Sequence, residues 1–188
     1  MGNRRIAGIK AKTNGKHFEG ILDKYFSYYA VNGYCNIEKT PEPYRFIKPY
    51  TSNLFVGCFL KSAQPDYKGT LKGGRSIVLE AKSVSNGRIN LSALTENEYK
   101  QLKLHKELGA CAGVLVYDSV ENNIYLLPFI MFEEMENLFK LKHIKLNLLQ
   151  KFEISKKLNS TEITGLFNYI LSLNLEDLKL LLEKKEIN

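Results

Sequence analysis

Two charged residues follow directly on an apolar segment in the middle of the chain, and this feature restricts the possible folds more than any other. In Ser76-Ile-Val-Leu-Glu-Ala-Lys82, the residues up to Leu79 are typical of a buried strand, but Glu80 and Lys82 come next. Because strand side chains alternate between faces, Glu80 and Lys82 point to the same face, opposite to their apolar neighbours. Charges beside a buried run require a partner or a function, since burying them alone is costly.

A turn rich in glycine and lysine brings a second acid to this segment. Lys68-Gly-Thr-Leu-Lys-Gly-Gly74 has the composition of a turn, so residues 66–80 are predicted to form a hairpin. The hairpin places Asp66 beside Glu80, where two carboxylates repel each other unless a divalent cation such as Mg²⁺ lies between them. Lys82 would then lie beside the metal and could orient or help to deprotonate an attacking water. A solvated ion pair on a surface hairpin is the alternative interpretation.

The other segments predict a mixed α/β domain. Apolar residues from Phe18 to Tyr29 recur with helical spacing, and Thr95-Glu-Asn-Glu98 is a capping box that opens a second helix. Strands are predicted at 35–39, 54–60, 76–79, 112–117 and 124–127, and a short helix at 129–139. We therefore expect a central mixed sheet of about four or five strands, with helices 16–31 and 95–108 on its sides.

The composition changes after about residue 140. Lysines make the next stretch basic, and apolar residues between 166 and 182 predict two short amphipathic helices. We therefore divide the chain into a basic arm at 1–13, a core domain at 14–140, and a basic linker with a C-terminal helical extension at 141–188.

The distribution of positive charge indicates a polyanionic partner. The chain carries a formal net charge of +7, and residues 1–16 contain five cations and no acid, as in a flexible arm that neutralises phosphates. These cations are Arg4, Arg5, Lys10, Lys12 and Lys16. Arg45 and Lys48 alternate with aromatic residues, a mixture that can stack on unpaired bases. For the cations of residues 1–16, the alternative interpretation is a merely solubilising tail. For the aromatic residues around Arg45 and Lys48, it is the packing of an edge strand.

Several classes of protein are excluded or disfavoured by the sequence. No run of about 18 apolar residues could cross a bilayer, and no apolar signal segment follows the first residues, so we expect a cytoplasmic location and no membrane partner. Cys35, Cys58 and Cys111 are too widely spaced for a zinc site and are predicted to be core thiols. The phosphate-binding motif G-x-x-x-x-G-K-S/T is missing, so we expect no nucleotide cofactor.

Four short motifs occur in one consistent order within residues 14–128. They are Gly15-Lys-His-Phe-Glu19, Lys39-Thr-Pro-Glu-Pro43, Pro65-Asp66-Tyr-Lys-Gly69 and Glu80-Ala-Lys82-Ser83. Together they resemble the PD-(D/E)xK nuclease superfamily and, within it, the RecU-type Holliday-junction resolvases, including their phage members. The resemblance implies a restriction-endonuclease-like core. It also implies that a homodimer cuts four-way DNA junctions by paired nicks in recombination and repair, with Mg²⁺ as cofactor and Mn²⁺ as a substitute.

The resemblance implies roles for individual residues. Asp66, Glu80 and the carbonyl of Ala81 would hold the metal, and Lys82 would be the catalytic lysine. Glu19 would be a further acid near the metal. The residues themselves leave two interpretations of Glu19 open, because it borders the buried face of its helix but is also an ordinary first-turn acid. Tyr67 and Ser83, within the same motifs, are assigned to DNA binding.

The sequence departs from the family pattern in two places. The family has a glutamine on the helix after the E-x-K strand; Glu98 stands at the matching position here, and Gln101, one turn further on, is ranked ahead of it as the catalytic residue. The segment 41–66 is shorter than the region of RecU that forms a protruding stalk. Two other functions stay open, a restriction-like or repair nuclease with another DNA target and a non-catalytic DNA-binding accessory, although the intact acids and lysine argue against the second.

Overall fold

The computed structural model describes residues 2–59, 64–137 and 142–146, and for residues 2–12 and 134–137 it describes the backbone alone. The amphipathic helices predicted between 166 and 182 lie outside the described residues. In the described part of the chain, no helix combines the length and the apolarity that crossing a membrane requires.

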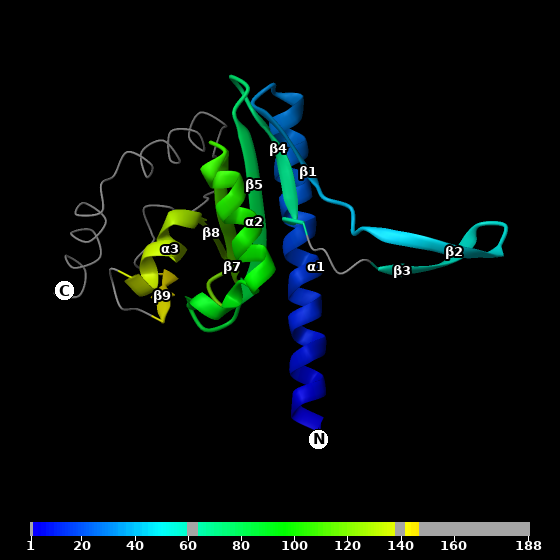
Figure 1. Ribbon diagram of the computed structural model, residues 1–188. Coiled ribbons are helices and arrows are strands. Elements are labelled where there is room, and N and C mark those ends of the chain that lie inside the picture. The colour runs from blue at the N-terminus through cyan, green and yellow to red at the C-terminus, as the bar shows by residue number, and fades with distance from the viewer. Residues whose placement is uncertain (1, 60–63, 138–141, 147–188) are drawn as a thin grey trace.

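A five-stranded mixed sheet forms the centre of the structure (Figure 1). In spatial order its strands are β1 (Cys35–Lys39), β4 (Tyr67–Leu71), β5 (Ser76–Val84), β7 (Cys111–Asp118) and β8 (Asn123–Pro128). Strands β5 and β7 are parallel, and every other neighbouring pair is antiparallel. The predicted core, a central mixed sheet flanked by helices, is therefore confirmed.

Helices cover both faces of this sheet. Helix α1 (Gly2–Val31) packs on one face, where Phe18 and Leu22 join the same apolar cluster as Leu79. Helices α2 (Glu96–Glu107) and α3 (Phe129–Asn137) lie on the other face, in a cluster that contains Val78 and Leu102 (Figure 1). Alternation along β5 thus supplies two separate cores from consecutive residues.

Residues 2–13, predicted to be part of a flexible arm, are helical in the structure and belong to α1. The sequence places the start of this helix at about residue 16, but the structure continues it back to Gly2, and its N-terminal part extends beyond the sheet (Figure 1). Residues 2–31 contain no proline, and the glycines at 8, 15 and 20 each cost only about 1 kcal/mol of helix propensity. The first residue with a left-handed backbone is Gly33, with a φ of 68°.

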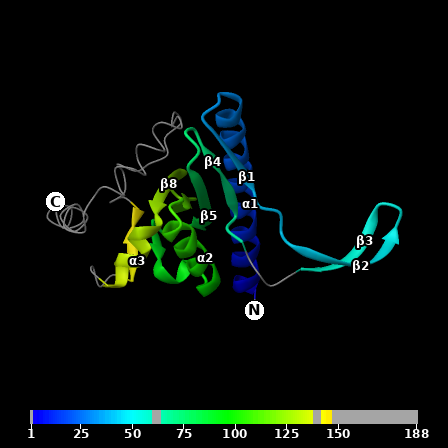
Figure 2. The ribbon, with the colours of Figure 1, turned by 45° about the horizontal axis from the view of Figure 1, so that its top comes forward.

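A second correction concerns the segment between β1 and β4. Strands β2 (Tyr44–Thr51) and β3 (Leu54–Phe59) pair with each other in a ribbon that stands away from the sheet (Figures 1 and 2). Strand β3 is predicted, but β2 is not, because Pro49 interrupts its pattern; a two-stranded ribbon tolerates this proline because each strand has a free edge. Cys58 lies on this ribbon instead of in the core, whereas Cys35 and Cys111 are buried as predicted.

Two short strands extend the core beyond the predicted domain boundary at 140. Strand β6 (Arg88–Asn90) pairs with β9 (His143–Lys145), and a 3-10 turn, η1 (Leu91–Ala93), leads from β6 toward α2. Ile144 and Leu146 are buried in the cluster beneath α2 and α3. The first residues of the predicted linker are therefore part of the packed domain.

Gly69 in β4 allows the edge strand β1 to come close. A Cβ at this position would lie 2.0 Å from the carbonyl oxygen of Asn36 and 2.6 Å from the Cα of Ile37. We expect Gly69→Ala to lower the free energy of unfolding by about 3 kcal/mol, because backbone atoms would have to move. Gly20→Ala is the control, since a Cβ there meets nothing within 4 Å and should leave stability equal or higher. Urea unfolding followed by circular dichroism measures both, and equal stability of the two variants would contradict this account.

Candidate active site

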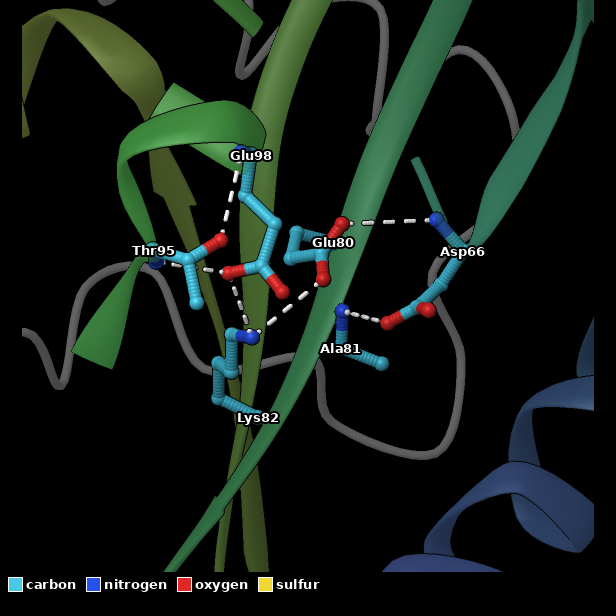
Figure 3. A network of polar contacts seen from close by, with 6 residues as sticks. All are labelled: Asp66, Glu80, Ala81, Lys82, Thr95 and Glu98. Carbon is cyan, nitrogen blue, oxygen red and sulfur yellow. Dashed lines mark hydrogen bonds and ion pairs between the residues drawn. The ribbon is translucent and has the colours of Figure 1, made fainter. Parts of the chain in front are cut away.

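The register between β4 and β5 brings the two predicted acids together. Tyr67 pairs with Leu79, so Asp66 lies opposite Glu80. The backbone N–H of Asp66 donates to Oε2 of Glu80 at 3.4 Å, and Oδ2 of Asp66 accepts from the backbone N–H of Ala81 at 2.9 Å (Figure 3). The predicted hairpin is confirmed, and it sets the Asp66 carboxylate, directly before β4, beside that of Glu80 on β5.

Lys82 is held between two carboxylates. Its Nζ donates to Oε1 of Glu80 at 3.2 Å and to Oε2 of Glu98 at 2.9 Å (Figure 3). The side chain of Glu80 is 4% exposed and that of Lys82 is 21% exposed, so the pair is shielded from bulk water. The two charges that interrupt the apolar strand therefore face each other on its α2 side.

The capping box of α2 supplies the second partner of Lys82. Oε2 of Glu98 also accepts from the backbone N–H of Thr95 at 2.9 Å, while the backbone N–H of Glu98 donates to the Thr95 hydroxyl at 3.3 Å. Glu98 therefore contacts Lys82, whereas Gln101, within the described residues, makes no hydrogen bond to the acids or to the lysine. Gln101 as the catalytic residue stays a prediction. Position N3 of a capping box points back to the helix start, whereas Gln101 lies one turn away from it.

The electrostatics of the site favour the uptake of positive charge. Burial raises the pKa of Glu80 to about 8, and the nearby charge of Asp66 adds to this effect. Burial also raises the pKa of Asp66. For Glu98, burial acts in the same direction, but the hydrogen bonds from Lys82 and from the Thr95 backbone outweigh it and keep its pKa below the ordinary value. Glu80 and Asp66 are thus two adjacent carboxyls whose charged forms are destabilised.

A hard divalent cation fits this donor set. The side chains of Asp66 and Glu80 and the carbonyl of Ala81 would provide hard oxygen ligands, and a cation would relieve the cost of ionising both acids. Among the described residues, no three His, Cys, Asp or Glu side chains converge in the manner of a metal site. A bound metal would therefore depend on the backbone carbonyl and on water for its remaining ligands.

Glu19 lies on the other side of the sheet edge from Lys82. Its Oε2 accepts from Nζ of Lys39 at 2.6 Å, and the hydroxyl of Tyr67 donates to Oδ1 of Asp23 at 3.3 Å. The hydrogen bond to Glu19 is the main reason that the pKa of Lys39 is raised, and Asp23 and Asp66 contribute through their charges. Asp23 was not predicted as part of the site, although its position four residues after Glu19 on α1 indicates that the two share a face.

The residues predicted to bind DNA are distributed over three parts of the structure. Arg45 and Lys48 are exposed on the ribbon, Lys16 is exposed on α1, and Ser83 is exposed on β5. Arg4, Arg5, Lys10 and Lys12 belong to the part of α1 whose backbone alone is described. Tyr67 is a correction: it is fully buried against Phe26 at a ring distance of 5.2 Å, because β4 directs it to the core under α1.

Comparison with known proteins gives a consistent result. A family model described as Recombination protein U matches residues 13–174. The Holliday junction resolvase RecU of Bacillus pumilus (strain SAFR-032) is 30% identical over 132 residues, which is 66% of this chain and 63% of the relative. The chain thus spans less than two thirds of that relative's length. Among solved structures, Hjc of Archaeoglobus fulgidus, a Holliday junction resolvase, is similar with a TM-score of 0.48 and 16% identity, covering 80% of this chain and 95% of Hjc.

The pairing of Lys82 with Glu80 leads to a stability prediction. At pH 9, above the raised pKa of Glu80, Lys82→Ala should lower the free energy of unfolding by about 1–3 kcal/mol, because the buried Glu80 carboxylate would lose the cation that pairs with it. In a Glu80→Gln background, Lys82→Ala should lower the free energy of unfolding clearly less, since the glutamine left behind is neutral. Lys100→Ala, which breaks an exposed ion pair with Glu96 on the same helix, is the control and should change stability little. Urea unfolding measures the wild type and all of these variants, and equal losses in both backgrounds would refute the coupling.

Proposed function

This chain belongs to the Recombination protein U (RecU) family, and we propose that it is a structure-selective DNA endonuclease that resolves Holliday junctions in recombination and repair. The observation that carries the proposal is the convergence of Asp66, Glu80 and Lys82 on one face of adjacent strands. The named activity of the Bacillus pumilus relative supports it. DNA as the substrate also makes a cytoplasmic location part of the proposal.

Asp66, Glu80 and the Ala81 carbonyl would hold the cofactor, which we propose to be Mg²⁺, with Mn²⁺ as a substitute. The chemistry that such an ion supplies when bound is Lewis-acid stabilisation of the charge on the scissile phosphate. The N–H of Ala81 orients the Asp66 carboxylate, and the N–H of Asp66 does the same for Glu80. These bonds hold both ligands in place before DNA arrives, which reduces the cost of assembling the site.

Lys82 would act on the phosphate and on the attacking water. Its ammonium stays charged, because the hydrogen bond to Glu98 and the charge of Glu80 raise its pKa against the effect of burial, which lowers it. A fixed cation at this point stabilises the negative charge that develops on the phosphate as the P–O bond breaks. Glu98 acts as a positioning residue, because it ties the ammonium to the start of α2.

The symmetry of the substrate leads to a proposal for the oligomeric state. A four-way junction presents two equivalent strands, so paired nicks need two active sites related by a two-fold axis. We therefore propose a homodimer, which light scattering would detect as a mass of about twice 21.5 kDa.

The ribbon β2–β3 is the proposed determinant of junction selectivity. Its aromatic side chains are largely exposed, with Tyr50 at 72% and Phe59 at 72%, and Arg45 and Lys48 lie among them. Aromatic side chains interleaved with cations bind unpaired bases by stacking and phosphates by charge. Such bases become accessible at the centre of a junction, which the protruding ribbon could reach (Figure 2).

The catalytic proposal is tested by single substitutions at the acids and the lysine. Asp66→Asn, Glu80→Gln and Lys82→Ala should each abolish nicking of a labelled four-way junction in Mg²⁺, because they remove a metal ligand or the cation near the phosphate. The two carboxylate variants should bind the junction in EDTA as well as the wild type or more tightly, since repulsion of phosphate is reduced. Partial recovery of a carboxylate variant in Mn²⁺ would support metal ligation.

Controls separate this proposal from the other functions. Glu96→Gln removes an exposed glutamate on α2 and should cut normally. A matching linear duplex and single strands, each with Mg²⁺ or EDTA, test for a nuclease with another DNA target. Full activity of Glu80→Gln on junctions would overturn the assignment, and a wild type that binds without cutting any DNA would favour a non-catalytic accessory.

The role of the ribbon is tested by excising it. The N–H of Thr40 donates to the carbonyl of Asp66 at 2.8 Å, so the chain before the ribbon and the chain after it already meet at the base of the ribbon. Replacing residues 44–59 with a short Gly-Ser turn should leave the unfolding free energy nearly unchanged, because the ribbon adds nothing to either core. The variant should cut junctions at least about tenfold more slowly, while its residual cleavage loses the preference for junctions over duplex. An unchanged preference would assign selectivity to another part of the molecule.

A further inference from the structure

Lys68 lies on the same face of the sheet as the catalytic acids. Side chains alternate along β4, so Lys68 points away from α1, whereas Tyr67 and Leu71 point into the core beneath it. Helix α2 packs against β5 and β7, which leaves β4 at the border of the area that it covers. Lys68 is therefore half-buried and accessible at that border.

Lys68 is held by a neutral group. Its Nζ donates to Oε1 of Gln64 at 2.9 Å, and among the described residues it forms no ion pair. The amide oxygen accepts one of the three ammonium protons and restrains the side chain without neutralising its charge. An orientated cation thus lies two residues from Asp66; its cross-strand neighbour is Glu38 on β1, with which it forms no ion pair in the described residues.

A second basic side chain comes from α2. This helix connects the parallel strands β5 and β7 and runs antiparallel to them, so Glu98 lies near Lys82 and His105, two turns later, lies near the start of β5. Lys68 pairs with Val78 in that same region. The pKa of His105 is lowered by burial and, in addition, by the charge of Lys68, which agrees with their closeness.

We propose that Lys68 and His105 form a binding site for the phosphodiester next to the one that is cleaved. This inference rests on the proposed nuclease function and adds a subsite to it. Two residues along a strand span about 7 Å, which is on the order of the distance between successive phosphates in a DNA backbone. The ammonium of Lys68 provides charge, and the neutral imidazole of His105 provides a hydrogen bond to a phosphate oxygen.

The salt dependence of DNA binding tests this site independently of cleavage. In EDTA at pH 8, Lys68→Gln should weaken binding of a linear duplex and a four-way junction. It should reduce the slope of log K against log salt by about 0.9 over about 50–200 mM, the value for one phosphate contact. Lys68→Arg should restore the slope because it restores the charge. Lys100→Gln is the matched control, since it removes a lysine that is exposed and paired with Glu96, and it should leave the slope unchanged.

His105 gives a second readout by NMR. Addition of duplex should shift the imidazole resonances of His105 in the wild type, and Lys68→Gln should reduce this shift. His105→Ala should lower the affinity at pH 8 with little change in slope, because the lost group is neutral there. An unchanged slope and affinity in Lys68→Gln would overturn the subsite. A wild type that binds DNA but does not cut it would refute the nuclease proposal, and the slope difference would still decide the subsite.

Discussion

The antiparallel register of β4 and β5 is the constraint on which the rest of the site depends. It places Asp66 opposite Glu80, and the backbone of each strand then orients the carboxylate of the other. A slip of one residue would send Glu80 and Lys82 into the apolar core beneath α1 and Leu79 to the polar face. The apolar residues on both sides of β5 therefore protect the geometry of the acids, because any other register would bury charge.

Helix α2 has a structural and a chemical role that meet in one side chain. Glu98 satisfies the free N–H of Thr95 at the start of the helix and also accepts from Lys82. The lysine is therefore positioned by the same interaction that begins the helix, and the loop from β5 to α2 cannot shift without changing both. The carboxylate of Glu98 also adds a charge-assisted bond to the ammonium of Lys82.

The two faces of the sheet edge are chemically different. On the α2 side, Lys82 lies between Glu80 and Glu98, and Lys68 and His105 form the proposed basic pair. On the α1 side, Glu19 and Asp23 lie near Asp66, and Lys39 partly compensates their charge. The DNA track that we propose follows β4 on the α2 side, where Lys68 and His105 would contact the backbone.

Local patterns in the sequence were sufficient to predict the parts of the structure that depend on neighbouring residues. The alternation in β5, the turn before it and the capping box at Thr95 each involve contacts within about 20 residues, and all are present in the structure. Tertiary structure decided the rest. Glu98, and not Gln101, reaches Lys82, because the packing of α2 on β5 sets which turn of the helix faces the strand. Tyr67 is buried, and β2 forms despite Pro49, because the placement of α1 and the free edges of the ribbon determine what each strand contacts. Such contacts join residues far apart in the chain, and no periodicity within one segment encodes them.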